Sequence, residues 1–358
     1  MELFDVVHAY ATLFTVLSAL LVAVILGRHF RDDVHLCREA DFRQTTEPVI
    51  KNYLSGSVRL KEAVTALKKN PPLALTLLLD FSEAATSQEI APLRALGKSM
   101  GYLQPMLAGL THGNEADRLQ NAQRLGYLRD ESAVPELMKA LDDPSPDVRL
   151  AAAQSLALLE CSEAVKTILL NSDFAGEMPR DRVVEVLVQF GTHALAPLAE
   201  TLNDPQASDK TLALAVQASG MLQAKKAVPH LVKVLQHKTP QLRRNTVCAL
   251  AAIGDSKAIV PLSRLAEDLD PEVKSDVMLS LGALKAQDQI PLVVRALNDP
   301  AWEVRLSAAQ ALYQMGKAGR KALENAAGHE GDSLARNISR QILQEHGHAL
   351  PAGRAFAS

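Results

Sequence analysis

The chain has 358 residues, 47% of them hydrophobic but only 4% aromatic, and its formal net charge is −3. This composition is sufficient for a large core of stacked helices and argues against a β-sandwich. Cys37, Cys161 and Cys248 lack the pairing or spacing of a disulfide framework or metal site, so free thiols in a reducing compartment are expected.

The first distinct element is an uncharged stretch of 19 residues, from Ala9 to Gly27. As a helix it would extend for about 28 Å, close to the thickness of a bilayer's hydrocarbon core. A buried helix of the soluble fold is one alternative. A cleaved signal peptide is another, although Glu2 and Asp5 make the leading region acidic and no clear cleavage site follows. We therefore expect residues 1–27 to be an N-terminal transmembrane anchor, with the span at residues 9–27.

Cations flank this stretch on one side only. None precedes it, and four arginines follow it, Arg28, Arg31, Arg38 and Arg43. The positive-inside rule then places everything after Gly27 in the cytoplasm. The expected product is a single-pass protein of the cytoplasmic membrane, which in a bacterium is the inner membrane.

Residues 28–70 are mildly basic, with nine Lys/Arg and six Asp/Glu. Such a segment suits contact with anionic lipid, and an ordinary solvated helix pair leading into the next domain fits equally well. Its helical patterns do not match the repeat that follows. We predict a juxtamembrane helical cap.

From residue 71 onward, prolines recur at a regular interval. They stand 30, 62, 32, 32 and 30 residues apart, and the interval of 62 corresponds to two units with one proline missing. The prolines are Pro105, Pro135, Pro197, Pro229, Pro261 and Pro291. Proline suits the first turn of a helix, and apolar residues follow each one with the spacing of one helical face.

A second helix is predicted after the turn in each unit. It opens with an apolar residue and a cation, and seven residues later comes a leucine, such as Leu250 or Leu312, which should be buried between units. Alanines keep one side of this helix thin: Ala152, Ala153, Ala308 and Ala309. Glycines stand where a left-handed C-terminal cap is expected: Gly191, Gly220, Gly254 and Gly316.

A pair of helices in about 31 residues cannot bury both of its faces alone, so neighbouring pairs must stack into an α-solenoid. We place the solenoid at residues 71–346. Its last helix, residues 331–346, is polar enough for a terminal cap, and residues 347–358 are predicted to be a frayed C-terminal tail.

The recurrent proline, the Asp-Pro turn and the Val-Arg start resemble the HEAT repeat family, in particular the short bacterial repeats called PBS-lyase HEAT-like. The resemblance covers residues 72–346. It implies an all-α fold, a solenoid of HEAT-type helix pairs preceded here by one transmembrane helix. HEAT solenoids usually act as protein-binding scaffolds and a few are enzymes, so the resemblance implies a fold more strongly than a function.

Catalytic motifs are hard to find. No phosphate-binding loop, nucleophile motif or CxxC occurs, and of the His-Glu pairs typical of HEAT-type iron hydroxylases only His329-Glu330 stands in the right order. Nothing marks a pigment site of the bilin-attaching relatives, and the predicted anchor argues against that role. Residues 71–358 carry 29 Lys/Arg against 33 Asp/Glu, which argues against nucleic acid. We predict no enzyme activity, no cofactor, no metal, no nucleic acid and no small-molecule substrate.

A cation recurs at nearly the same place in successive units, at Arg149, Lys210, Arg243, Lys274 and Arg305. One interpretation is a structural ladder with carboxylates of the turns, such as Asp143 and Asp147 beside Arg149. The other is a binding surface for an acidic partner. The turn at residues 236–245 has no acid, so Lys238, Arg243 and Arg244 are expected to face solvent without carboxylate partners.

The sequence therefore predicts a membrane-tethered cytoplasmic scaffold that binds another protein. The predicted contacts are Lys238, Arg243, Arg244, Lys210, Lys274 and Arg305. Because tethering raises the effective concentration toward partners in the same membrane, we expect a membrane-embedded enzyme or transporter. The alternative is an enzyme of unrecognised type that uses the concave groove of the solenoid.

Overall fold

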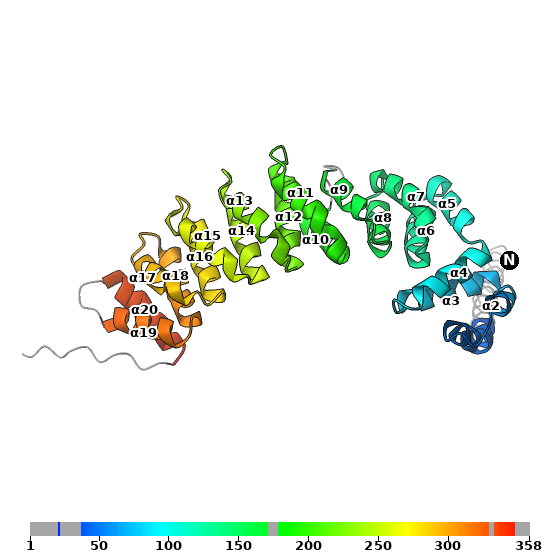
Figure 1. Ribbon diagram of the computed structural model, residues 1–358, viewed down its shortest axis with the longest axis horizontal. Helices are drawn as coiled ribbons and strands as arrows, with labels where there is room; N and C mark the ends of the chain where they lie inside the picture. Colours follow the sequence, from blue (N-terminus) through cyan, green and yellow to red (C-terminus); the bar gives the residue numbers. More distant parts are fainter. Residues whose placement is uncertain (1–20, 22–36, 171–177, 329–332, 348–358) are drawn as a thin grey trace, which may run out of the picture. The chain divides into compact units, whose positions relative to one another are not determined.

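The structure, a computed structural model, describes residue 21 and residues 37–170, 178–328 and 333–347. In these residues every regular element is an α-helix or a 3₁₀-helix, which confirms the all-α class. The chain forms two compact units, residues 1–133 (unit 1) and residues 134–358 (unit 2) (Figure 1).

The predicted membrane span, residues 9–27, lies outside the described residues except for Leu21, which is helical and 62% exposed. Among the described residues, no helix combines the length and the apolar character needed to cross a bilayer. The anchor therefore stays a prediction. The predicted tail, residues 347–358, also lies outside the description except for Gly347.

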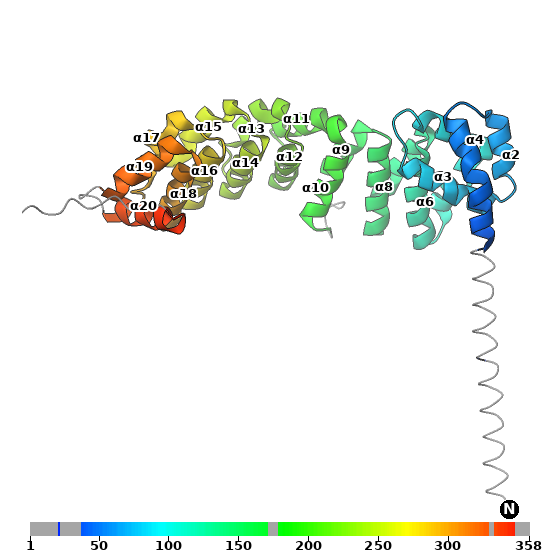
Figure 2. The ribbon, with the colours of Figure 1, turned by 90° about the horizontal axis from the view of Figure 1, so that it is seen from below.

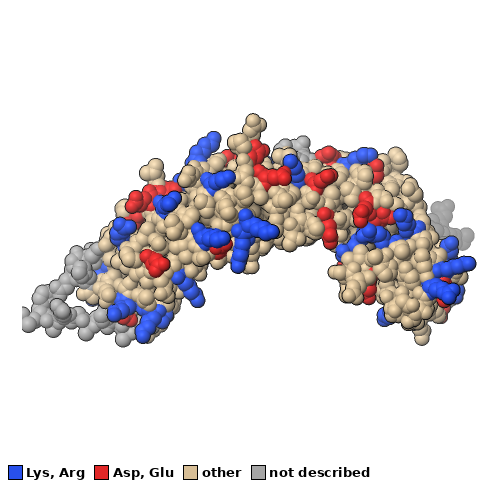
Figure 3. Space-filling view, viewed as in Figure 1, with Lys and Arg blue, Asp and Glu red and all other residues tan. Residues whose placement is uncertain are grey.

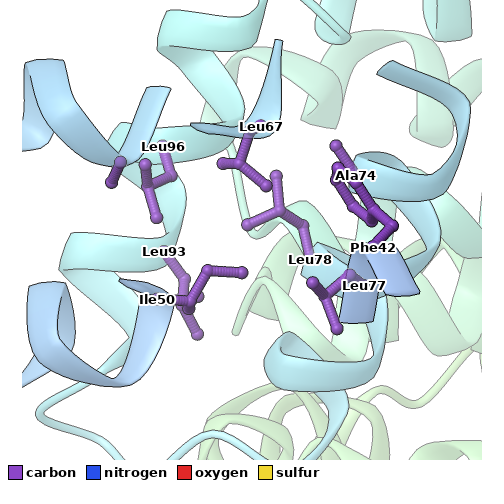
Figure 4. Packing of buried hydrophobic residues seen from close by; sticks show 9 residues of the cluster. Phe42, Ile50, Leu67, Ala74, Leu77, Leu78, Leu93 and Leu96 are labelled. Carbon is purple, nitrogen blue, oxygen red and sulfur yellow. The ribbon is translucent and has the colours of Figure 1, made fainter. Parts of the chain in front are cut away.

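Unit 1 has one hydrophobic core, which includes side chains from both sides of the predicted boundary at residue 70. Its elements are the helix at residues 37–54, α2 (Leu60–Leu67), α3 (Pro71–Glu83), α4 (Ile90–Met100), α5 (Leu103–His112), α6 (Glu115–Leu128) and the 3₁₀-helix η1 (Glu131–Ala133). Buried side chains from the first four of these helices meet in Figure 4, among them Ile50, Leu67, Leu78 and Leu96. The predicted cap is thus packed against the helices that follow it.

Unit 2 repeats a helix pair seven times among its described residues. The first helices are α7 (Val134–Lys139), α9 (Ser162–Leu170), α11 (Leu195–Asn203), α13 (Val228–Val234), α15 (Ile259–Arg264), α17 (Ile290–Ala296) and α19 (Lys317–Gly328). The second helices are α8 (Pro146–Leu158), α10 (Arg180–Gln189), α12 (Asp209–Met221), α14 (Pro240–Ile253), α16 (Pro271–Ala283), α18 (Trp302–Gln314) and α20 (Ser333–Glu345). Most first helices begin or end in a 3₁₀ turn: η2 (Ala140–Asp142), η3 (Gly191–Ala194), η4 (Lys225–Ala227), η5 (Ser256–Ala258), η6 (Leu265–Glu267) and η7 (Gln287–Gln289).

These helices form two layers. Each second helix packs on the next, from α8 through α10, α12, α14, α16 and α18 to α20, and this is the second-helix layer. The first helices form the first-helix layer on its other side, as Figure 2 shows for α9, α11, α13, α15 and α17. Pro135, Pro229 and Pro291 stand at the second residue of α7, α13 and α17, as their role in a first turn predicts.

The backbone conformation repeats with the same period as the helix pairs. A residue with positive φ closes each second helix of unit 2, and Arg129 closes α6 of unit 1 in the same way. The series runs Arg129, Glu160, Gly191, Gln223, Gly254, Lys285, Gly316 and Gly347, at intervals of 31 residues with a single interval of 32. Four of the eight are not glycine, so four caps carry the strain that a side chain brings to this conformation.

Gly220 is a correction to the predicted caps. It lies inside α12, and Gln223 takes the left-handed position three residues later. A Cβ atom at Gly220 would stand 3.0 Å from the Cα of Ala249 on α14, and one at Gly282 on α16 would stand 2.7 Å from the Cα of Ala311 on α18. These glycines, like the fully buried alanines predicted to thin this side, permit close packing of adjacent second helices.

Replacing Leu312 with alanine should lower the free energy of unfolding by about 2–5 kcal/mol, because Leu312 and Leu250 are fully buried between helices, as predicted. Denaturant titration followed by circular dichroism measures the loss. Leu269→Ala is the matched control, since that side chain is 99% exposed and its removal should change stability by less than about 0.5 kcal/mol. Equal losses in both variants would contradict the assigned packing.

Candidate protein-binding surface of the second-helix layer

The recurrent arginines Arg149 and Arg305 donate hydrogen bonds to backbone carbonyl groups of the preceding turn. Nη1 of Arg149 donates to the carbonyl oxygens of Asp143 and Pro144, at 2.8 and 3.2 Å. Nη1 of Arg305 donates to those of Asp299 and Pro300, at 2.8 and 2.9 Å. Carbonyls just past a helix end have no partner within that helix, so the guanidinium joins the two helices of its own pair.

Arg243 makes the same contacts and adds a carboxylate. Nη1 donates to the carbonyl oxygens of His237 and Lys238, at 2.9 and 3.1 Å. Its Nε and Nη2 donate to the two carboxylate oxygens of Asp268, at 2.8 and 2.7 Å, and both side chains are nearly buried. Asp268 belongs to the turn of the next unit. Lys274 repeats this contact with Asp299 at 2.5 Å, so each of these two cations pairs with a carboxylate in the turn of the next unit.

The expectation that Arg243 and Arg244 have no carboxylate partner is wrong. Arg244 donates to Asp276 at 2.8 Å and also pairs with Glu272, both on α16. The partners come from the following unit, whereas the prediction considered only acids of the local turn. Of the three predicted residues, only Lys238 is exposed, and its side chain forms no ion pair within the described part of the chain. On the visible face of unit 2, cations and acids are likewise interspersed (Figure 3).

The left-handed caps show which residues are equivalent to one another at the recurrent cation position, called the cation column below. Counting back eleven residues from each cap gives Arg118, Arg149, Arg180, Leu212, Arg243, Lys274, Arg305 and Arg336. Lys210 is therefore out of the column by two residues, and it is exposed in the first turn of α12. The prediction missed Arg118, Arg180 and Arg336. Arg118 donates to the carbonyl oxygen of Gly113 at 3.2 Å, which is the same type of backbone contact.

Burial alone would raise the pKa of Asp268. Hydrogen bonds from Arg243 and from the backbone N–H groups of Asp270 and Leu269, with the charge of Arg243, outweigh that effect and hold the pKa below its ordinary value. The charged carboxylate is thus the form that the folded protein favours.

Asp268→Asn should lower the free energy of unfolding at neutral pH by about 1–3 kcal/mol, because Arg243 loses a nearly buried charged partner. The wild-type contribution is present above the unfolded-state pKa of about 3.9 and is lost as the pH falls through the lower, folded-state pKa. Denaturation at a series of pH values should therefore show the two proteins converging in acid. Asp288→Asn, an exposed control, should keep the wild-type pH dependence.

The second-helix layer leaves a depression of ≈ 330 Å³ between α10, α12 and α14. Its lining is uncharged apart from Arg180: Gln217, Gly220, Met221, Asn245, Cys248, Ala249 and Ala252. Met221 at its rim is 54% exposed. The amide of Gln217 donates to Asp181 at 3.1 Å, and that of Asn245 accepts from Gln241 at 3.0 Å. The depression offers apolar contact together with side chains that can both donate and accept hydrogen bonds.

Cys248 is the one thiol in this lining. Its side chain is exposed, but desolvation by the surrounding atoms raises its pKa above the ordinary value, and the nearby Asp276 acts in the same direction against the opposing charge of Arg244. Because the thiolate is the reactive form, this cysteine is a poor nucleophile at neutral pH. It contributes contact area more than reactivity.

Among the described residues, no three His, Cys, Asp or Glu side chains are grouped as metal ligands would be. His329 and Glu330, the one ordered pair found in the sequence, lie outside the described residues.

The fold and its repeats define an α-solenoid, and a comparison with known families agrees. The family model described as HEAT repeats matches residues 103–187, 195–278 and 261–344, which is more than half of the chain. The chain belongs to the HEAT repeat family.

Individual relatives add detail. The chain is 30% identical to the bilin biosynthesis protein PecE of Nostoc sp. (strain PCC 7120) over 100 residues, which are 28% of this chain. The match spans 40% of that curated relative's length. The complex of CpcE and CpcF of phycocyanin lyase from Nostoc sp. PCC7120 matches with 22% identity over 70% of this chain and 89% of that one, at a TM-score of 0.28. Human deoxyhypusine hydroxylase matches with 18% identity over 85% and 98% of the two chains, at a TM-score of 0.30.

The curated relative contradicts the prediction that the chain is not an enzyme, because it is named for a biosynthetic role and is 30% identical over the 100 matched residues. The prediction failed because a repeat pattern reports which residues stack and gives no account of chemistry done at a surface.

Proposed function

We propose that this protein is a HEAT solenoid held at a membrane by residues 9–27, and that it binds another protein on the second-helix layer of unit 2. The residues after Gly27 then lie in the cytoplasm, at the cytoplasmic membrane. The single observation that carries the binding proposal is the open depression between α10, α12 and α14. The partner is itself membrane-embedded, because tethering concentrates the solenoid toward proteins of the same membrane.

The lining suits a protein segment. Gln217 and Asn245 can donate to and accept from a partner's main-chain amides, and the thioether of Met221 adapts to apolar side chains of differing shape. Since the lining carries little charge, shape and hydrogen bonds supply most of its specificity.

The predicted cations divide into two groups. Lys210 and Lys238 are exposed and remain proposed contacts for the partner. Arg243, Arg244, Lys274 and Arg305 already hold bonds within unit 2, so we assign them to positioning the helices.

Met221→Asp should weaken capture of the partner by about tenfold or more, because it places a charge in the apolar part of the contact. Chemical cross-linking in membranes, then detergent extraction, affinity purification and quantitative mass spectrometry, measures the captured partner. Leu269→Asp is the matched control: an exposed apolar residue of the same unit, outside the depression. Equal capture by Met221→Asp and wild type would reject this surface.

Fractionation tests the anchor. The full chain should stay with membranes through carbonate and high-salt washes, because a span of residues 9–27 is released only by detergent. A variant lacking residues 1–27 should appear in the soluble fraction. A C-terminal reporter that is active only outside the cytoplasm would contradict the proposed orientation.

A second candidate function is a role in bilin biosynthesis, favoured by the identity to PecE. Titration of the purified full chain with biliverdin, a bilin, should then change the visible absorption spectrum. An unchanged spectrum would reject bilin binding and leave the protein-binding proposal in place.

A further inference from the structure

Four cations stand on the exposed side of the first-helix layer at α13 and α15. Lys226 in η4 and Lys257 in η5 each lie three residues after a left-handed cap, and Lys233 and Arg264 follow seven residues later. All four side chains are exposed. Lys226, Lys233, Lys257 and Arg264 are called the first-helix array below.

The array has no carboxylate partner within the part of the chain that the structure describes. Lys233 donates to the neutral amide oxygen of Asn203 at 2.7 Å, and the other three have no side-chain hydrogen bond. Around Lys226 and Lys233 the sequence does not compensate locally, since residues 210–254 contain seven Lys/Arg and no Asp or Glu. Arg243 and Arg244 of that stretch are neutralised by α16 and its turn, which leaves the lysines uncompensated.

Helix dipoles explain half of the array. Lys233 and Arg264 lie in the last turns of α13 and α15, where the negative end of the dipole favours a cation. Lys226 and Lys257 precede the same helices, at the positive end, where a cation is disfavoured. Two other units of unit 2 carry an acid at this repeat position, Glu163 and Asp288. Two units therefore carry a cation where the helix itself favours an acid, and no ion pair among the described residues accounts for that choice.

The array has a defined spacing. Seven residues of helix advance about 10 Å, and packed helices lie about 8–10 Å apart, so the backbone positions of the four residues lie at the corners of a square with sides of about 10 Å. Val260 is 55% exposed and stands between Lys257 and Arg264, three residues after the first and four before the second. It gives the square an apolar contact on the same helical face.

We propose that the first-helix array binds an acidic helical segment of a protein, with carboxylates at positions i and i+7 and an apolar residue between them. The inference rests on the proposed protein-binding function and adds a second contact of defined chemistry. A helix presents i and i+7 on one face about 10 Å apart, matching each cation pair, and its apolar residue meets Val260. Exposed Glu267 and Asp288 border the array and repel carboxylates placed outside it.

The test uses the full chain in nonionic detergent and two labelled helical peptides of identical composition. In one, glutamates stand at i and i+7 with a leucine between them, and in the other the glutamates are adjacent. Fluorescence anisotropy at several salt concentrations should show tighter binding of the first peptide, with affinity that falls as salt rises.

The variant Lys226→Glu/Arg264→Glu should lose at least about tenfold in affinity for the i, i+7 peptide. It should fold, because an acid is accommodated at the position of Lys226 in two other units, as Glu163 and Asp288. The control variant Lys317→Glu/Lys321→Glu has the same change in net charge at exposed cations of α19, outside the array and outside the proposed partner contacts, and its affinity should change by less than about threefold.

The proposal is overturned if both peptides bind equally, or if both double variants lose affinity equally. It is also overturned if anionic vesicles or single-stranded DNA bind more tightly than the peptide and lose binding in Lys226→Glu/Arg264→Glu, since the ligand is then a lipid or a nucleic acid. Met221→Asp should leave peptide binding unchanged. Failure of the array therefore stays distinguishable from failure of the second-helix surface, because the two lie on different layers.

Discussion

Every helix pair of unit 2 has apolar side chains on both of its sides, and this constraint governs the rest of the structure. A pair exposed on one side would leave leucines such as Leu250 and Leu312 in water, each at a cost of about 1.5–3 kcal/mol. Stacking removes that cost only if adjacent second helices approach closely. Gly220 beside Ala249 and Gly282 beside Ala311 permit this approach, because a Cβ atom at either glycine would collide with the facing backbone.

Close stacking leaves the turns as the place where polar groups must be satisfied. The arginine at the start of a second helix reaches back to the carbonyls that end the first helix, as Arg149 and Arg305 do. Arg243 and Lys274 also reach forward to an aspartate of the next unit. The side chain at this one repeat position thus bonds the two helices of its own pair together and, at Arg243 and Lys274, also bonds that pair to the next. Apolar burial supplies the stacking energy, and these bonds set the register.

The sequence predicted the repeat, the two helices and the buried leucines because these depend on the periodicity of apolar residues and proline. It predicted the caps only where glycine occupies them. Glu160, Gln223 and Lys285 adopt the same left-handed backbone conformation, which their residue types do not predict. Without those caps the cation column could not be aligned across the extra residue near α12, so Lys210 was included and Arg180 was missed.

The carboxylate partners of Arg243 and Arg244 were missed for a related reason. They lie 25 to 32 residues further along the chain, in the next unit, and only the stacking brings them near. The depression at α10, α12 and α14 likewise draws on three units, so no single stretch of sequence contains it.

Because the repeat already uses the cations at the start of its second helices, they are poor indicators of a binding surface. The informative residues are those that depart from what their own helix favours. Lys226 and Lys257 stand at helix starts where other units carry Glu163, Asp288 or an uncharged residue, and no ion pair among the described residues compensates them. In a repeat protein, the residue at a given position can be compared with the residues at the same position in the other units. A change of charge shared by two adjacent units therefore indicates a functional role more clearly than the presence of a charge does.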